Sequence, residues 1–393
     1  MTQDPSDPAA PRLDFAAVSA RRMRRQFLDP PSAGATPADV AARMCSTHAQ
    51  VMPSAELAIG LRLDGAPRRT TQEALWRSRT LVKPFGPRGT LHLLPTAEYP
   101  MWIGALSALP PLPNSHRKDV KFAPEQTTAV VAAIGEALSD AELTADELDE
   151  AVVDIAGPWA GERTMPAFQG HWPRWRQSMA DAALRGALCF APNRGRNVVY
   201  TSPRRWLPGF RPEPGDTALP HLLQRYLHAY GPATPAHFAR WLAVPPRFAA
   251  ELFERAGAAL QRVEVGGEPA WVAAGDTELP ASPAPPVRLL PYFDQFVVAG
   301  AFRELLFPGE AAGRALSPAG QAGNFPVLLL DGVVGGVWHQ RKKGRRIEVT
   351  VEPLRPLSAA QRRALDDEVT RIGQVLEATP TLTVGTVSVG GHA

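Results

Sequence analysis

The chain contains very little cysteine, with only Cys45 and Cys189 among 393 residues. Both stand in apolar surroundings, so they indicate reduced thiols in a cytoplasmic protein and exclude the disulfide framework of a small secreted one. No Cys/His cluster has the spacing of a zinc or iron–sulfur site. No glycine-rich loop has the order of a phosphate-binding motif. We therefore expect neither a metal nor another cofactor.

Long apolar runs are also absent. No stretch reaches the roughly 18 apolar residues of a transmembrane helix. The N-terminal segment MTQDPSDPAAPRLDF is polar and proline-rich, without the apolar core of a signal peptide. Apolar residues nevertheless make up 45% of the chain, which predicts a globular protein of about two to four packed units. The sequence thus predicts a cytoplasmic protein with no membrane partner.

Lysine is scarce, since nearly all of the 42 basic residues are arginines, and the formal net charge is only +3. Positive charge gathers in segment 340–346, which contains Arg341, Lys342, Lys343, Arg345 and Arg346. Because this segment stands between strand-like runs at 326–338 and 347–351, we expect a hairpin with Gly344 in its turn. Such a tip suits contact with DNA phosphates. A solvated turn that keeps a sheet edge soluble is an equal alternative.

Three similar segments organise the first three-quarters of the chain. Thr36, Thr144 and Thr234 each open an amphipathic run, after helical patterns at 15–28, 124–138 and 219–230. Thr is a good helix N-cap, and Glu147 completes a capping box with Thr144. Strand-like runs at 88–95, 188–202 and 263–274 close the segments. Helix, capped helix, helix and β-hairpin is the order of a winged helix-turn-helix.

The pattern changes after the proline-rich linker 281–286. Strands are predicted at 287–291, 296–299, 326–337, 347–351 and 381–389, with a helix at 358–376. The predicted fold is therefore α+β. It has three tandem winged helix-turn-helix units, at 12–120, 121–215 and 216–280, and a β-rich, barrel-like C-terminal domain at 287–393.

His48-Ala49-Gln50 places two polar side chains around a small apolar residue, within a stretch that otherwise has the character of a core. Pro53 biases Met52 away from the α region, so the chain should leave its helix here. An extended chain points His48 and Gln50 to the same side, where both could hold a water molecule. The alternative is a helix end whose His and Gln cap backbone carbonyls, and composition alone favours that alternative.

Five segments resemble, in order along the chain, the winged-helix DNA glycosylase superfamily of the AlkZ, azinomycin-resistance type. They are HAQVMPSAELAIGLRL (48–63), PRGTLHLLP (87–95), RYLHAYGPATPAHFARWL (225–242), LLPYFDQFVVAG (289–300) and VLLLDGVVGGVW (327–338). The resemblance implies three winged helices around a DNA-sized channel. It also implies monofunctional removal of N3- or N7-alkylated purines from double-stranded DNA without a metal. We expect a monomer, and self-resistance to a DNA-alkylating natural product is one biological role for it.

In that family the motif at this position is Gln-x-Gln, and both glutamines serve catalysis. Gln50 matches the second glutamine, whereas His48 departs from the first. The resemblance therefore implies a catalytic role for Gln50 directly, and one for His48 if imidazole can replace the amide. Arg88 and His92 match a family strand near the active cleft, as a phosphate clamp and a contact to the lesion or sugar. The alternative is an Arg in a salt bridge and a packed His.

Other residues complete the predicted DNA contacts. Arg194 and Arg196 lie in a hairpin turn, and the five basic residues of segment 340–346 form a second tip. Asp294 could supply a carboxylate near the site, although an Asp that caps a turn is more common. The alternative function is a non-catalytic winged-helix DNA-binding protein, a lesion sensor or a regulator, in which His48 marks lost activity.

Overall fold

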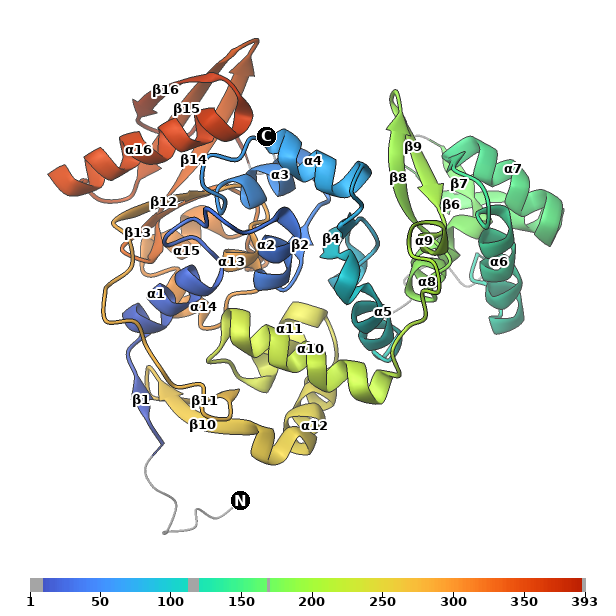
Figure 1. Ribbon diagram of the computed structural model, residues 1–393, viewed down its shortest axis with the longest axis horizontal. Helices are drawn as coiled ribbons and strands as arrows, with labels where there is room; N and C mark the ends of the chain where they lie inside the picture. Colours follow the sequence, from blue (N-terminus) through green and yellow to red (C-terminus); the bar gives the residue numbers. More distant parts are fainter. Residues whose placement is uncertain (1–9, 112–119, 168–169, 391–393) are drawn as a thin grey trace. The chain divides into compact units, whose positions relative to one another are not determined.

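The computed structural model describes residues 10–111, 120–167 and 170–390 (Figure 1). Segment 1–9, which carries part of the N-terminal prediction, lies outside them. The chain divides into two compact units: the first joins Met1–Gln72 to Leu223–Ala393, and the second is Glu73–Leu222. Over the described ranges, no helix has the length and apolarity to span a bilayer.

The N-terminal part of the first unit is mainly helical. Its elements are β1 (Arg12–Leu13), α1 (Phe15–Arg25), α2 (Pro37–Arg43), β2 (Thr47–His48), α3 (Met52–Gly60) and α4 (Arg68–Trp76). Thr36 begins α2 as predicted, because its hydroxyl accepts the Asp39 N–H while the Asp39 carboxylate accepts the Thr36 N–H. The short β1 pairs in parallel with β10 of the same unit.

A five-stranded sheet forms the C-terminal part of the first unit. Its strands, in spatial order, are β12 (Val287–Leu290), β13 (Val327–Leu330), β14 (Val333–Lys343), β15 (Arg346–Pro353) and β16 (Thr379–Val384). All pairs are antiparallel except β15 and β16, which are joined by α16 (Ala359–Leu376). The helix lies along the sheet in Figure 1. The predicted barrel-like domain is therefore an open half-barrel.

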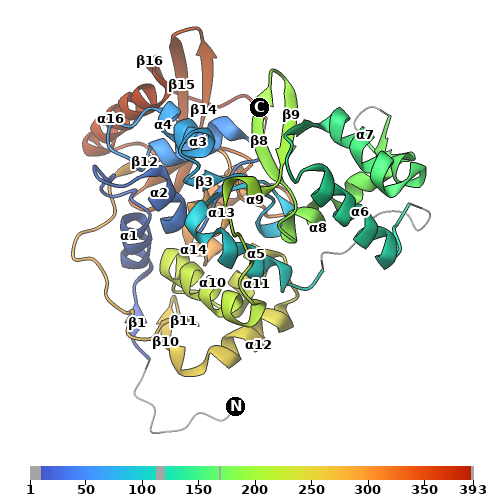
Figure 2. The same cartoon turned by 45° about the vertical axis from the view of Figure 1, so that its right-hand side comes forward.

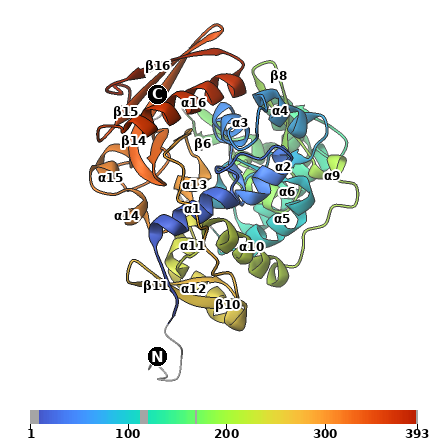
Figure 3. The same cartoon turned by 60° about the vertical axis from the view of Figure 1, so that its left-hand side comes forward.

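Both faces of β13 are buried, and its successive side chains point into different cores on the two sides of the sheet. Val327 and Leu329 of β13 face a core that also includes α1 residues and α13 (Gln295–Val298), α14 (Arg303–Leu306) and α15 (Glu310–Ala315). Figure 3 shows α1 beside α13. Leu328 faces the opposite core, where Leu57 of α3 packs with α16. The sheet thus packs against α1 on one face and, on the other, against α3, the helix that follows the segment 45–51 with His48 (the His48 segment).

Close packing fixes α3 on α16. Gly60 comes so near to Val375 that a Cβ at this position would lie 2.5 Å from Val375 Cγ1. Leu61 packs into the same core. The helix therefore has little freedom to slide or rotate, and the chain that enters it at Val51 has a fixed end point.

The remaining helices of the first unit precede a hairpin. They are α10 (Gly215–Tyr230), α11 (Pro235–Leu242) and α12 (Pro246–Ala256), and the hairpin is β10 (Leu260–Val265) and β11 (Glu268–Ala273). Thr234 caps α11 as predicted, with the His237 ring in the place of the usual carboxylate or amide. The order of helix, capped helix, helix and hairpin is therefore present in this segment.

The second unit contains short helices and three small sheets. Its helices are α5 (Tyr99–Ser107), α6 (Pro124–Ala137), α7 (Ala145–Ala156), α8 (Met179–Leu184) and α9 (Pro203–Trp206). Its strands are β3 (Leu81–Val82), β4 (His92–Pro95), β5 (Leu143–Thr144), β6 (Arg163–Pro166), β7 (His171–Pro173), β8 (Cys189–Arg194) and β9 (Asn197–Thr201). Figure 2 shows α6 and α8 near the base of the β8–β9 hairpin. Thr144 and Glu147 form the predicted capping box of α7.

Four predicted strands differ from the structure. Segment 296–299 is helical, because the Asp294 carboxylate accepts the Phe296 N–H at 2.9 Å and begins α13. Segment 326–337 is two strands, since Asp331 and Gly332 adopt φ of 53° and 89° in a tight turn. Within 88–95 only His92–Pro95 is a strand, and the last strand ends at Val384. Short apolar runs do not distinguish strand from helix.

Candidate active site

The His48 segment begins with an unusual helix end. After α2, the N–H of Cys45 donates to the Ala42 carbonyl at 3.0 Å and that of Ser46 donates to the Ala41 carbonyl at 3.0 Å. This is the Schellman pattern, in which glycine usually takes the left-handed position. Here Cys45 and Ser46 both have positive φ, at 49° and 88°. The turn redirects the chain from α2 into β2.

His48 lies in the extended chain between α2 and α3, as the sequence predicted. Only 6% of His48 and none of Ala49 is exposed, whereas Gln50 is exposed. Val51 is 40% exposed and begins α3 without a side-chain cap. The motif therefore crosses from the interior to the surface within three residues. The cap positions of the two neighbouring helices are Met44 for α2 and Val51 for α3.

Phe293 covers the imidazole of His48. The two ring centroids are 4.7 Å apart and the ring planes are tilted by 31°. Phe293 has a φ of 57°, a left-handed conformation that is uncommon for a bulky residue. A benzene ring at this distance excludes water from one face of the imidazole, so any water molecule that His48 binds approaches in the plane of its ring nitrogens.

Asp294 is an anchor and not a free carboxylate. It is fully buried and binds the fully buried Arg62 through two contacts of 2.8 Å. Its Oδ1 also accepts the N–H of Phe296. Arg62 further donates to the Ala58 carbonyl at 2.9 Å. The role of a cap, the commoner alternative for Asp294, is confirmed, and the ion pair with Arg62 adds to it.

The thiol beside the motif is inert. Burial raises the pKa of Cys45 to about 12, and only 1% of the residue is exposed. Since the thiolate is the nucleophile in cysteine chemistry, this residue does not offer covalent catalysis at neutral pH. Among the described residues no group of His, Cys, Asp and Glu side chains could hold a metal ion.

Arg88 and His92 lie in the second unit, close together in the chain. Arg88 has a φ of 61° within the 3-10 turn Pro87–Gly89, so it does not belong to the strand predicted for it. His92 begins β4 and is fully buried, with Nδ1 3.0 Å from the Thr90 carbonyl oxygen. A Cβ on Gly86 would lie 2.6 Å from this nitrogen. His92 is therefore a packed residue of the second unit, which agrees with the alternative stated for it.

The predicted basic residues lie at two hairpin tips. Arg194 ends β8 and Arg196 lies in the turn before β9, where both are exposed. Arg194 pairs with both carboxylate oxygens of Glu147 at 2.9 Å. This pair neutralises part of the charge of the tip, so Arg196 is the stronger candidate for a contact with phosphate.

The second tip is confirmed as a hairpin. Gly344 has a φ of 62° between β14 and β15, and the surrounding basic residues are all exposed, namely Arg341, Lys342, Lys343, Arg345 and Arg346. Lys343 pairs with Glu348 of β15 at 2.8 Å. Desolvation and the charge of Arg341 lower the pKa of His339, farther along β14. The tip therefore gathers five exposed basic side chains, of which Lys343 is paired with a carboxylate.

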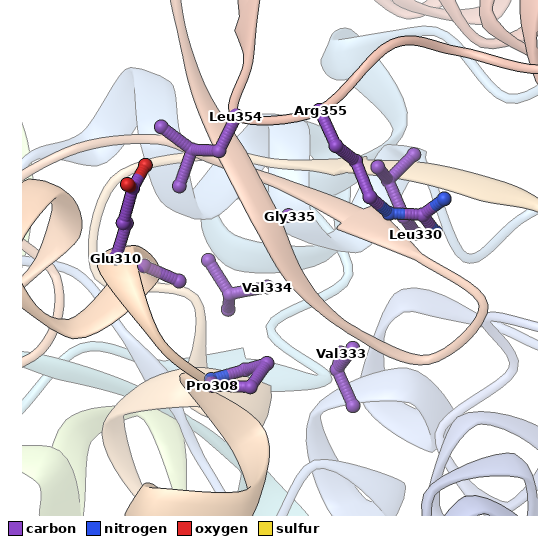
Figure 4. Close-up of a pocket in the computed structure, with 9 residues that line it drawn as sticks. Pro308, Glu310, Leu330, Val333, Val334, Gly335, Leu354 and Arg355 are labelled. Carbon is purple, nitrogen blue, oxygen red and sulfur yellow. The ribbon is translucent and has the colours of Figure 1, made fainter.

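A shallow apolar pocket lies in the C-terminal half of the first unit (Figure 4). It is lined by Pro308, Glu310, Ala311, Leu330, Val333, Val334, Gly335, Leu354 and Arg355. Figure 4 shows Glu310 and Arg355 on different sides of the apolar residues. None of the predicted site residues lines this pocket.

The sequence reasoning missed Phe293 and Arg62, two residues that support the His48 segment. Arg62 gave a usable signal, because an arginine at the end of the apolar run of α3 needs a buried partner. Phe293 gave none, since its contact with His48 joins positions far apart in the chain.

Comparisons with known proteins agree with this architecture. A sequence model of the "DNA glycosylase AlkZ-like" family matches residues 41–375. The chain is 33% identical over 342 residues to the interstrand DNA cross-link repair glycosylase of Streptomyces sahachiroi, covering 83% of this chain and 88% of that protein. The structure of the DNA glycosylase AlkZ of the same organism superposes with a TM-score of 0.79 at 26% identity, over 95% of this chain and all of the other. The chain therefore belongs to the AlkZ-like DNA glycosylase family.

Proposed function

We propose that this protein hydrolyses the N-glycosidic bond of N3- or N7-alkylated purines in duplex DNA, with His48 and Gln50 as catalytic residues. The observation that carries the proposal is the extended chain at the family's catalytic position. It holds a buried His48 under Phe293 and brings Gln50 to the surface. The cross-link repair named for the Streptomyces relative suggests bulky adducts among the substrates.

The chemistry suits these two side chains. An alkylated purine already carries positive charge, so it leaves without the proton that a glycoside hydrolase supplies from a carboxylic acid. The remaining task is to hold a water molecule and to tolerate positive charge on the sugar. The amide oxygen of Gln50 can accept a hydrogen bond from water but is not a practical base. Neutral His48 can orient the water and also take its proton.

We propose a monofunctional hydrolase over a lyase. A lyase requires an amine nucleophile whose pKa is depressed in an apolar pocket. Lys342 and Lys343 belong to the exposed basic tip and have no such pocket. In the proposed reaction water is therefore the nucleophile and no covalent intermediate forms.

The two basic hairpins are the proposed DNA contacts outside the site. Phosphate neutralisation by Arg and Lys gives affinity that is independent of sequence and depends strongly on salt. Arg196 and the tip around Gly344 fit this role, and Arg88 is a candidate phosphate clamp. We further propose that the three Thr-capped segments, at 12–120, 121–215 and 216–280, act as winged helices along the duplex. The protein would work as a monomer in the cytoplasm, where the DNA is.

One observation favours a second function. His48 stands where the family motif has glutamine, so this chain could be a DNA-binding relative that recognises lesions without excising them. Such a protein would bind alkylated duplex with a strong salt dependence and leave no abasic sites. The two functions therefore differ in one measurable product.

The decisive experiment incubates the protein with duplexes that contain N7-methylguanine or a bulky natural-product adduct, followed by alkali cleavage at abasic sites. We expect cleavage with the wild type and loss of cleavage with Gln50→Ala at unchanged duplex affinity. Gln374→Ala, on the exposed side of α16, is the matched control and should retain full activity. Binding without cleavage by the wild type would identify the lesion-binding protein instead.

A further inference from the structure

Two strained residues stand directly before the proposed catalytic strand. Cys45 and Ser46 both adopt left-handed φ, at 49° and 88°, although neither is glycine. Both are buried, with 1% and 0% exposure. Non-glycine residues keep such conformations only where the surrounding structure imposes them, and these positions cluster at functional sites. The surroundings of this turn therefore show what holds His48 in place.

Tyr230 of α10 holds the turn through a hydrogen bond to its backbone. Its hydroxyl donates a hydrogen bond to the carbonyl of Met44, the residue immediately before the two strained positions. Both Tyr230 and Met44 are fully buried. Burial raises the pKa of Tyr230 well above that of a free phenol, so the hydroxyl keeps its proton at neutral pH and can donate it to the Met44 carbonyl. The bond fixes the plane of the peptide from which the turn starts.

Phe293 limits the same segment from the opposite end. Its ring lies over the imidazole of His48, and the backbone of Phe293 is held by its neighbour Asp294, which is locked to Arg62. Phe293 therefore sets the plane of the imidazole ring, and Tyr230 sets the position of the backbone that leads to His48. Between Met44 and His48 the chain has only three residues, too few to absorb a change at either end.

We propose that Tyr230 and Phe293 are positioning residues for His48. Tyr230 sets the path of the backbone into β2, and Phe293 sets the plane of the imidazole that orients the water. The inference rests on the proposed glycosylase function, since it assigns a role in that reaction. Neither residue is required to contact DNA, because both act through the geometry of His48.

The same helix offers a matched control. Tyr226 lies one turn before Tyr230 on α10, is equally buried, and places its hydroxyl 3.4 Å from the Ala299 carbonyl oxygen. If buried hydroxyls of α10 serve only packing, Tyr226→Phe and Tyr230→Phe should have the same effect. If Tyr230 positions His48, only Tyr230→Phe should affect the reaction.

The test compares Tyr230→Phe, Tyr226→Phe and Phe293→Leu in the full chain. It measures the single-turnover excision rate, the dissociation constant for a lesion duplex, and the ring resonances of His48 by NMR during a pH titration. We expect Tyr230→Phe to slow excision by about tenfold to a hundredfold, the range for a misplaced catalytic group, with duplex affinity unchanged. The His48 resonances should shift in Tyr230→Phe and Phe293→Leu and stay in place in Tyr226→Phe.

Three results would overturn the inference. They are wild-type rates in both Tyr230→Phe and Phe293→Leu, equal effects of the two tyrosine variants, and a slower reaction with unchanged His48 resonances. If Tyr230→Phe does not fold, Phe293→Leu decides the question by the excision rate and the His48 resonances. If the wild type excises nothing, the proposed function fails, whereas the resonances of His48 still report whether the two residues fix its ring.

Discussion

The buried pair of Arg62 and Asp294 provides the most quantitative prediction. Both side chains are fully inaccessible and are joined by two contacts of 2.8 Å. Asp294→Asn keeps the shape of the side chain and an oxygen that can still accept the Phe296 N–H, but it removes the charge. The guanidinium of Arg62 then stays in the interior without a counter-ion. Breaking one partner of such a pair costs about 3–5 kcal/mol.

This cost is a large fraction of the roughly 5–15 kcal/mol that stabilises most folded proteins. The loss should appear as a lower midpoint of urea unfolding, measured by circular dichroism. The melting temperature should also fall by about 10 °C, because a unit of this size loses ~2–4 °C per kcal/mol. Glu348→Gln is the matched control. It breaks the Lys343–Glu348 pair, whose side chains are 53% and 49% exposed, and should leave the urea midpoint nearly unchanged, because solvent screens an exposed ion pair.

A double-mutant cycle completes the test. Arg62→Met combined with Asp294→Asn removes both charges, so the double variant should be more stable than the sum of the single losses indicates. The reasoning would be refuted if Asp294→Asn cost no more than Glu348→Gln, or if the two single losses added without coupling.

Three further predictions concern pH and salt. Excision should fall as the pH drops far enough to protonate His48, because imidazolium cannot accept a proton from water. His48→Gln should flatten this acid limb, and an identical limb in the variant would remove His48 from the mechanism. Neutralising Arg345 and Arg346 together should reduce the slope of log affinity against log salt by about two, since each lost phosphate contact contributes roughly 0.9; an unchanged slope would place the tip away from DNA. Burial, followed by nearby arginines, lowers the pKa of His237 from 6.5 to about 3. Below pH 6.5 the unfolded chain therefore binds a proton at His237 that the folded chain does not bind. The contribution of His237 to the free energy of unfolding is fully present above pH 6.5 and decreases as the pH falls toward 3. The loss is on the order of 2 kcal/mol at pH 5, and His237→Gln should weaken the acid dependence measured by urea unfolding; an equal dependence in the variant would contradict the assignment.

The sequence predicted those features that depend on neighbours in the chain. The three threonine caps and the hairpin at Gly344 each follow from a few adjacent residues, and the structure confirms them. The effect predicted for Pro53 was wrong, because Met52 and Pro53 form the first turn of α3 and the earlier helix α2 already ends at Arg43. The short run 296–299 was wrong because four apolar residues fit a strand or a helix equally well. The carboxylate that begins this helix was visible in the sequence, but its consequence for the backbone was not.

Contacts between distant positions were beyond sequence reasoning. Arg62 and Asp294 are 232 positions apart, and Tyr230 and Met44 are 186 apart. No local sequence pattern determines which buried arginine pairs with which buried carboxylate. The left-handed turn at Cys45 and Ser46 was equally hidden, because residue types that avoid positive φ give no warning of it. The candidate catalytic residues were found through the family motif, whereas their supports required the structure.

The packing of α3 against α16 has a consequence for synthesis of the protein. A ribosome completes Glu73–Leu222 while the sheet that anchors the His48 segment is still untranslated, since β12 begins only at Val287. Helix α3 cannot pack until α16 emerges from the ribosome, about 300 residues later. During this delay Leu57 and Leu61 are exposed on the nascent chain. Domains generally fold as units during synthesis, so the second unit can form first. A product released early would then carry the complete His48 segment in its sequence but no means to assemble it.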